Sequence, residues 1–207
     1  MPKELTSEEK ITVASYDAIA PQWAAAHSDL NFWQQELRVF QKYLPYGDII
    51  EIGAGGGRDA KILAATGYSY FGIEPSKLIK EARKNNPQLR FAQQSVYDLN
   101  STEAFDGFWA SAVLLHIPKS RINEALSSIH QVIRKDGIGF ISIKQGIGEG
   151  ILTEEEFKQT INRYFAYYST EEFMRILYQG GFDVLESQTK PLSPKTTWLN
   201  FFVKVQK

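Results

Sequence analysis

Residues 48–57 read DIIEIGAGGG, a short apolar run that leads into a cluster of glycines. The apolar run predicts a buried strand, and the glycines predict a tight turn, because glycine adopts backbone conformations that other residues avoid. In an α/β sheet such a turn lies at the carboxyl edge, beside the point where ligands bind. By itself the glycine turn fits a nucleotide site and an ordinary α/β turn equally well.

Short apolar runs alternate with amphipathic helices downstream of this turn. We expect strands at 48–52, 69–73, 89–93, 105–110 and 138–143, and helices near 58–66, 76–85 and 118–135. This alternation indicates βαβ units, a parallel sheet and right-handed crossovers.

The C-terminal part breaks the alternation. Strands are expected at 182–187 and 197–205, joined by the polar stretch 188–196, which contains Pro191 and Pro194 and has no helical pattern. A parallel crossover needs a dozen or more residues, usually a helix. The last two strands should therefore pair antiparallel.

Two capping boxes mark helix starts outside this core, at 6–9 and at 169–172. The first predicts a helix that Pro21 interrupts, followed by a second apolar stripe over 32–44. The second predicts a helix that ends at Gly180. We expect a single domain over 1–207, with a helical cap at 1–44, a core at 48–144, an insertion or lid at 145–168, and a C-terminal helix and hairpin at 169–207.

Composition narrows the class of protein. The chain has 207 residues, 43% of them hydrophobic, a net charge of −1 and no cysteine. The absence of cysteine excludes a disulfide framework and a thiolate metal site, and the balanced charge argues against nucleic acid as a partner. The polar, acidic N-terminal segment is unlike a signal peptide, and no apolar stretch approaches the ~20 residues of a membrane helix. We expect a soluble cytoplasmic protein, monomeric or homodimeric, that does not bind a membrane.

Two acidic residues indicate which kind of nucleotide the turn would bind. A dinucleotide fingerprint would place its third glycine at position 58, where the chain has Arg58. Glu51 precedes the glycines by two residues and suits a cationic group better than a pyrophosphate. Glu74 ends the next strand, where an acid can bind both hydroxyls of a ribose.

Five stretches together resemble the class I S-adenosylmethionine-dependent methyltransferases. They are 48–57, Glu74 within 72–76, 94–99, 105–111 and 114–118. The resemblance covers about 48–145 and extends to the C-terminus through the closing antiparallel strand. It implies a doubly wound, Rossmann-like, seven-stranded sheet that is mostly parallel, with S-adenosylmethionine as cofactor and S-adenosylhomocysteine as product.

The resemblance also implies site residues. The cofactor would contact Glu51, Gly53, Ala54, Gly55, Arg58, Glu74, Pro75, Ser76, Ser95, Val96, Ser111, Ala112 and Tyr16. Family members often grip the adenine with an acid after the third strand. This chain has Ser95 at that position, and Asp98 follows three residues later.

Several candidates keep two interpretations. His116 is a base candidate, or a histidine that packs against cofactor or caps a helix. Tyr16 and Trp23 cover the cofactor, or pack in the core of an amphipathic helix. Arg58 neutralises the cofactor carboxylate, or is solvated.

The acceptor wall is expected from Lys144 and the segment 145–168. Candidate substrate residues are Trp23, Lys144, Tyr164 and Tyr168, while the same segment could instead be a helix packed beside the sheet. Residues 154–156 are three acids, which favour the first turn of a helix over a metal site. No histidine has companions at metal-ligand spacing, so no metal is expected.

These patterns together predict methyl transfer from S-adenosylmethionine to a small-molecule acceptor, with a protein or tRNA acceptor left open. Two other classes remain as alternatives. A nicotinamide-dependent oxidoreductase would have a parallel sixth strand, and a non-catalytic nucleotide-binding module would bind cofactor without transferring a group.

Overall fold

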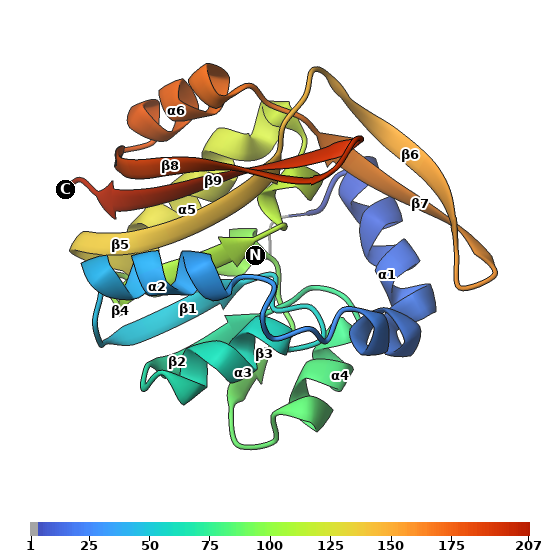
Figure 1. The fold of residues 1–207 in the computed structure, drawn as a ribbon, viewed down its shortest axis with the longest axis horizontal. Coiled ribbons are helices and arrows are strands. Elements are labelled where there is room, and N and C mark those ends of the chain that lie inside the picture. Colours follow the sequence, from blue (N-terminus) through green and yellow to red (C-terminus); the bar gives the residue numbers. More distant parts are fainter. Residues whose placement is uncertain (1–3) are drawn as a thin grey trace.

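The computed structural model describes residues 4–207, which form one seven-stranded sheet between helices, together with a separate β-hairpin (Figure 1). The strands lie in the order β3-β2-β1-β4-β5-β9-β8. Their bounds are β1 Asp48–Ile52, β2 Ser69–Ile73, β3 Arg90–Ala92, β4 Phe105–Ser111, β5 Ile133–Lys144, β8 Phe182–Ser193 and β9 Thr196–Val205. The five strands β3, β2, β1, β4 and β5 pair in parallel, whereas β9 is antiparallel to both β5 and β8. The predicted fold class is confirmed.

The strand order reverses beside β1. The chain runs from β1 outward to β2 and β3, then returns to place β4 on the other side of β1. The carboxyl ends of β1 and β4 therefore flank a topological switch point, which is where open α/β sheets bind ligands.

Helices cover both faces of the sheet. They are α1 Ser7–Ala26, α2 Gln34–Tyr43, α3 Arg58–Ala65, α4 Leu78–Asn85, α5 Ile122–Val132 and α6 Thr170–Gln179. Trp109 of β4 meets Phe40 of α2, while the preceding Phe108 meets Phe182, which contacts His130 of α5. Successive strand residues point to opposite faces, so α2 and α5 lie on opposite sides of the sheet.

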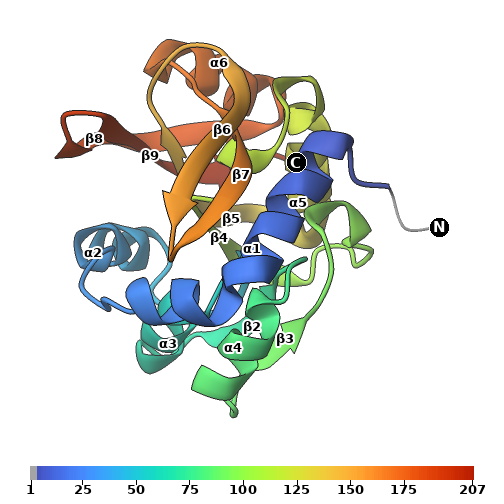
Figure 2. The same cartoon turned by 90° about the vertical axis from the view of Figure 1, so that its right-hand side faces the viewer.

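Helix α1 continues through Pro21, and the predicted interruption there is wrong. Figure 2 shows that α1 changes direction along its length. Proline lacks the N–H that would bond back to the carbonyl of Asp17, and its ring crowds that carbonyl, so a long helix bends at such a position without ending. The bend lets one helix follow the curved edge of the fold.

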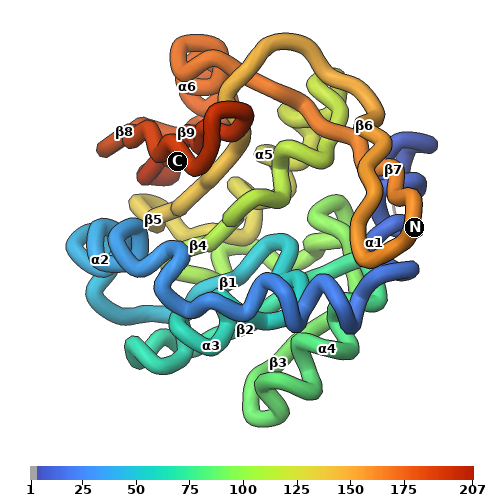
Figure 3. The backbone as a smooth tube through the Cα atoms, turned by 45° about the vertical axis from the view of Figure 1, so that its right-hand side comes forward, coloured from blue at the N-terminus to red at the C-terminus, as the bar shows by residue number. Residues whose placement is uncertain are grey.

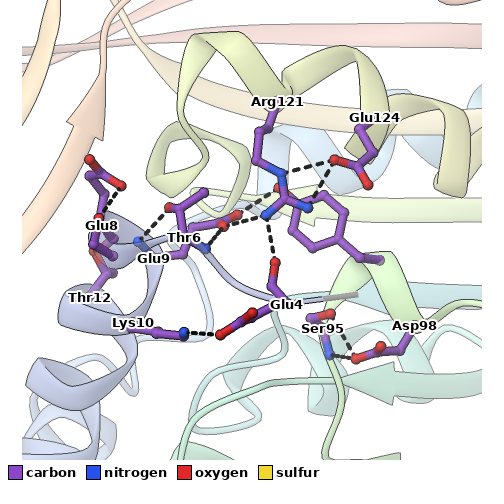
Figure 4. Close-up of polar contacts among 12 residues, drawn as sticks. Glu4, Thr6, Glu8, Glu9, Lys10, Thr12, Ser95, Asp98, Arg121 and Glu124 are labelled. Atoms are coloured by element: carbon purple, nitrogen blue, oxygen red, sulfur yellow. Dashed lines mark hydrogen bonds and ion pairs between the residues drawn. The ribbon is translucent and has the colours of Figure 1, made fainter. Parts of the chain in front are cut away.

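The first turn of α1 is fastened to the core by a cluster of ionic contacts (Figure 4). The Thr6–Glu9 capping box is present as predicted. The guanidinium of Arg121 donates to Glu9 at 2.8 Å and lies 3.9 Å from the ring centroid of Tyr97, whose hydroxyl also donates to Glu9 at 2.6 Å. These contacts fix the start of α1 over the sheet.

Residues 149–166 form a two-stranded hairpin, β6 Glu149–Glu156 and β7 Gln159–Ala166. The helical turn predicted for 154–156 is therefore wrong. Glu154 and Glu156 point to one side of β6, where Arg163 of β7 donates to them at 2.5 and 2.6 Å. Opposite charges on neighbouring strands stabilise the hairpin, and these pairs therefore favour strands over a helix in this segment.

The hairpin lies beside α1, as Figures 2 and 3 show. Ser15 of α1 donates through its hydroxyl to the carbonyl of Asn162 at 2.7 Å and accepts from the N–H of Asn162 at 3.0 Å. The hydroxyl of Thr12 accepts from the N–H of Tyr164 at 2.9 Å. Helix α1 and β7 thus form one continuous cover.

The end of the chain follows the expected connection. No helix lies between β8 and β9 in the described structure, and only Pro194 and Lys195 separate the two strands. Strand β8 runs through Pro191 to Ser193, further than predicted, which is compatible with proline because β8 is an edge strand. The helix expected over 118–135 is shorter, since α5 ends at Val132 and β5 begins at once.

Candidate functional site

A cavity of about 620 Å³ opens at the carboxyl ends of β1, β2, β4 and β5, under α1 and the β6–β7 hairpin. Its walls include nearly all of the residues predicted from the sequence. Tyr16, Trp23, Glu51, Gly53, Ala54, Gly55, Arg58, Glu74, Pro75, Ser95, Val96, Ser111, Ala112, His116 and Lys144 line it. Ser76, Tyr164 and Tyr168 are not among the lining residues.

The glycine turn after β1 leaves bare backbone against the cavity. Gly53 and Ala54 donate their N–H groups to the carbonyl of Ile73 at 2.9 Å, which ties the turn to the end of β2. Gly55 has φ +52° and no atom within 4 Å of where a Cβ would stand. A ligand can therefore approach the peptide of Gly55 without meeting a side chain.

Glu74 follows β2 and holds the turn in place. Its Oε2 accepts from the N–H of Gly55 at 3.1 Å, and its Oε1 accepts from the N–H and hydroxyl of Ser76 at 2.9 and 2.5 Å. Burial raises the pKa of Glu74, while these hydrogen bonds lower it. Ser76 thus contacts the carboxylate and not the cavity.

Glu51 and Asp59 bring a second pair of acids to the cavity. Glu51 is the next-to-last residue of β1, is buried, and accepts a hydrogen bond from the hydroxyl of Tyr70. Asp59 accepts from Ser111 at 2.6 Å and from the indole N–H of Trp109 at 3.0 Å. Burial and the nearby Asp59 raise the pKa of Glu51 well above its usual value.

Among residues 4–207, one cation is paired with these acids. Arg58 donates through Nε to Asp59 at 2.5 Å. Three buried acids, Glu51, Asp59 and Glu74, therefore surround a space with one neighbouring guanidinium. In this buried site the protonated form of Glu51 has a lower free energy than the ionised form, because burial disfavours the charge. A cationic ligand would favour the ionised form instead.

Beyond β3 the chain makes a 3₁₀ turn, Val96–Asp98. Asp98 accepts from the N–H and hydroxyl of Ser95 at 3.1 and 2.8 Å, so this acid caps the turn. Ser95 and Val96 line the cavity beside Pro75, whose carbonyl accepts from Gln93 at 3.2 Å. The wall here is neutral and partly apolar.

Tyr16 and His116 form a hydrogen-bonded pair in the roof. His116 Nδ1 lies 2.7 Å from the carbonyl of Tyr164, which can only accept, so Nδ1 carries the proton. His116 Nε2 then accepts from the hydroxyl of Tyr16 at 2.9 Å. Burial lowers the pKa of His116 to about 3 and raises that of Tyr16 to about 12, so both are neutral near pH 7.

The wall next to this pair is aromatic and contains two more cations. Arg163 is buried, with its guanidinium 4.8 Å from the ring centroid of Trp23, and is neutralised by two glutamates of β6. Lys144 ends β5, with Nζ 4.2 Å from the ring centroid of Phe165. Phe32, Trp33 and Trp198 complete this wall.

The two other predicted substrate residues lie behind the wall. The hydroxyl of Tyr164 donates to Glu149, and its backbone contacts His116 and α1. Tyr168 is fully buried against Phe173. Both support the hairpin from outside the cavity.

Asp59, Trp33 and Trp198 line the cavity and were missed by sequence reasoning. Asp59 follows Arg58 in the first turn of α3, where an acid is explained equally well by the helix dipole. Trp33 and Trp198 come from segments 165 residues apart in the chain, with ring centroids 5.7 Å from each other. Only the packed fold brings them together.

Two further tests bear on the class of protein. Within residues 4–207, no three His, Cys, Asp or Glu side chains are grouped so that they could hold a metal ion. None of the helices over the same residues has the length and apolar character required to cross a membrane.

A family model described as a methyltransferase domain matches residues 50–141. An uncharacterized methyltransferase of Alkaliphilus oremlandii is 22% identical over 165 residues, covering 72% of this chain and 74% of that protein. A ubiquinone biosynthesis O-methyltransferase of Rickettsia canadensis is 25% identical over 153 residues, which cover 67% of this chain and 64% of that protein.

Among solved structures, the fold resembles 1,6-didemethyltoxoflavin-N1-methyltransferase of Burkholderia thailandensis, whose structure contains 1,6-didemethyltoxoflavin and S-adenosylhomocysteine. The TM-score is 0.78 at 17% identity, over 100% of this chain and 94% of that one. At this identity the likeness concerns the fold.

The matched methyltransferase domain at residues 50–141 and the order of the sheet both agree with the Rossmann-like fold of class I S-adenosylmethionine-dependent methyltransferases. The resemblance noted in the sequence is confirmed. The alternative of a nicotinamide-dependent oxidoreductase required a parallel sixth strand, whereas β9 is antiparallel to β5.

Proposed function

We propose that this chain transfers the methyl group of S-adenosylmethionine to a small-molecule acceptor, both held in the cavity under α1 and the β6–β7 hairpin. The observation that carries the proposal is that two buried carboxyl groups, Glu51 and Glu74, line one cavity with the bare backbone of Gly55 at the switch point of the sheet.

The charges of the cavity fit this cofactor. The three buried acids Glu51, Asp59 and Glu74 exceed the one guanidinium of Arg58 beside them. S-adenosylmethionine has an ammonium and a sulfonium against one carboxylate, and its net charge of about +1 would favour the ionised forms of these acids. A dinucleotide pyrophosphate would add negative charge to the same space.

We assign roles to the lining residues on this basis. Glu74 binds the ribose hydroxyls, and Ser76 orients its carboxylate. Gly53, Ala54, Gly55, Glu51, Ser111 and Ala112 border the methionine end, with Arg58 near its carboxylate. Pro75, Ser95 and Val96 border the adenine, and Tyr16 covers the reactive centre with Trp23 beside it.

When bound, S-adenosylmethionine supplies a methyl group on a cationic sulfonium, which becomes a neutral thioether as the acceptor displaces it in line. The chain's own contribution is mainly alignment, which can be worth roughly 7–11 kcal/mol in intramolecular reactions. His116 can take a proton only through Tyr16, because Nε2 already accepts the phenol hydrogen. The burial-lowered pKa of His116 further favours a positioning role.

A small acceptor is supported by the enclosure of the cavity. Residues 1–44 and 145–168 act in this proposal as cap and lid over the core at 48–144, with 169–207 closing the sheet. The Burkholderia protein, which shares the fold over 94% of its chain, was solved with 1,6-didemethyltoxoflavin bound. The net charge of −1 offers no general attraction to nucleic acid.

Thermal unfolding with S-adenosylmethionine, S-adenosylhomocysteine, NAD(H) and NADP(H) tests this proposal. A ligand that binds only the folded state raises the Tm by mass action. We expect a rise with the first two ligands only. A rise with a nicotinamide cofactor and none with S-adenosylhomocysteine would overturn the proposal.

A further inference from the structure

A large part of the cavity lining consists of flat rings. Trp23, Phe32, Trp33, Phe165 and Trp198 line it, contributed by α1, by the segment before α2, by the β6–β7 hairpin and by β9. Such a wall favours a planar aromatic guest, because stacked and edge-on ring pairs add to the energy of burying apolar surface.

Lys144 is the charged group of this wall that no acid neutralises directly. Arg58 and Arg163 each have a carboxylate within 2.6 Å, whereas Lys144 has no carboxylate within 4.0 Å among residues 4–207. Its ammonium faces the ring centroids of Phe165 at 4.2 Å and Trp198 at 5.9 Å. It is half-buried, and burial lowers its pKa.

Lys144 is fixed in this direction by the sheet. It lies opposite Trp198 in the antiparallel register of β5 and β9, so the two side chains share one face. A lysine that only covered apolar surface would extend its ammonium to water. Here the ammonium remains at the wall of the cavity.

Two unpaired donors lie beside it. The indole N–H groups of Trp33 and Trp198 are buried and have no hydrogen-bond partner in the described part of the chain. The two rings meet edge to face at 5.7 Å. Both nitrogens are inaccessible to solvent, so they lie behind the surface of the cavity, and the two residues offer a ligand the carbon faces and edges of their rings.

We propose that Lys144 forms an anion subsite for the methyl acceptor between the aromatic rings of this wall, and that the acceptor is a small planar aromatic compound with an ionised oxygen, a carboxylate or a phenolate. This inference rests on the proposed function, because it names the class of substrate for the same cavity. An ammonium without a paired carboxylate selects an oxyanion, and the aromatic rings around it select a flat ligand that bears this oxyanion.

Binding measurements at saturating S-adenosylhomocysteine test the subsite without requiring turnover. Tryptophan fluorescence would be titrated with 4-hydroxybenzoate and its neutral counterpart 4-hydroxybenzamide, and with 4-nitrophenolate and nitrobenzene. The two pairs distinguish a carboxylate from a phenolate. We expect at least one anion to bind about tenfold or more tightly than its neutral counterpart.

Lys144→Met should abolish that preference, and Lys144→Arg, which keeps the charge, should restore most of it. Lys42→Met is the matched control. Lys42 also faces an aromatic ring, at 5.1 Å from the centroid of Tyr43, but it is exposed and does not line the cavity.

The inference is overturned if no probe binds at millimolar concentration, if neutral and anionic probes bind equally, or if Lys144→Met keeps the preference. It is also overturned if Lys144→Met weakens S-adenosylhomocysteine as strongly as it weakens the anion, since Lys144 would then belong to the cofactor. Failure of the wild-type protein to bind S-adenosylhomocysteine would instead refute the proposed function.

Discussion

Replacing Glu74 by Ala removes the carboxylate that joins the glycine turn to the end of β2. In the structure that carboxylate accepts three hydrogen bonds, two from Ser76 and one from Gly55. A carboxylate offers about four acceptor positions, so at least one remains for a ligand hydroxyl. Losing charge-assisted hydrogen bonds to the ribose should weaken binding by ~1–3 kcal/mol, or roughly 5- to 150-fold in Kd.

Isothermal titration with S-adenosylhomocysteine measures this loss. Glu74→Gln keeps one acceptor oxygen and the size of the side chain, so its Kd should lie between those of the wild type and Glu74→Ala. Glu81→Ala is the control, because Glu81 lies on the neighbouring α4 outside the lining of the cavity. An unchanged Kd for a folded Glu74→Ala protein would refute the ribose-binding role.

Three further outcomes are expected. His116 has a pKa of about 3 in the folded protein against 6.5 in the unfolded chain, so the unfolded chain binds the extra proton, and the free energy of unfolding falls as the pH drops below about 6.5, by up to about 1.4 kcal/mol per pH unit. Urea unfolding of His116→Gln between pH 7 and 4 should show a shallower decline than the wild type, and an equal decline would contradict a buried neutral ring. Arg121→Ala leaves the buried Glu9 without its ion pair and should lower the free energy of unfolding by about 2–3 kcal/mol in urea titrations, whereas no change would mean that the start of α1 is held by other contacts. Gly53→Ala forces φ +73° on a residue with a Cβ, 2.4 Å from Cγ2 of Val113, so calorimetry should show a loss of about 2–4 kcal/mol, and a Tm equal to the wild type would be incompatible with this turn.

Most of the sheet could be predicted because its signals are local. The glycine turn after β1 and the apolar runs of β2 and β4 can be recognised from neighbouring residues in the sequence. The antiparallel end of the sheet followed from the length of 188–196, which is too short for a crossover helix. Neither inference needed contacts between distant residues.

The β6–β7 hairpin could not be predicted for equally physical reasons. Strand β6 is mostly exposed, so no buried face imposes a period of two on its sequence. Its turn is Phe157-Lys158, where both residues have positive φ, 51° and 63°. Hairpin turns of this kind normally use asparagine, aspartate or glycine, so the usual turn signal is missing.

The candidate site also contains residues that the sequence could predict and residues that it could not. Glu51, Gly55 and Glu74 belong to a local motif and could be proposed from their spacing. The proposed acceptor wall is assembled from α1, the hairpin and β9, and Lys144 obtains its partners Phe165 and Trp198 only through tertiary packing. Tyr164 and Tyr168 were reasonable aromatic candidates, but their strand and the link after it turn them away from the cavity.

The central claim is that the glycine turn and the two buried acids beside it hold S-adenosylmethionine. A crystal structure of the protein with S-adenosylhomocysteine tests it most directly. We predict the ribose hydroxyls within hydrogen-bond distance of the Glu74 carboxylate, and the amino-acid end beside Glu51 and Gly53. A ligand found elsewhere on the molecule, or a ribose that leaves Glu74 bound only to Ser76 and Gly55, would contradict the account.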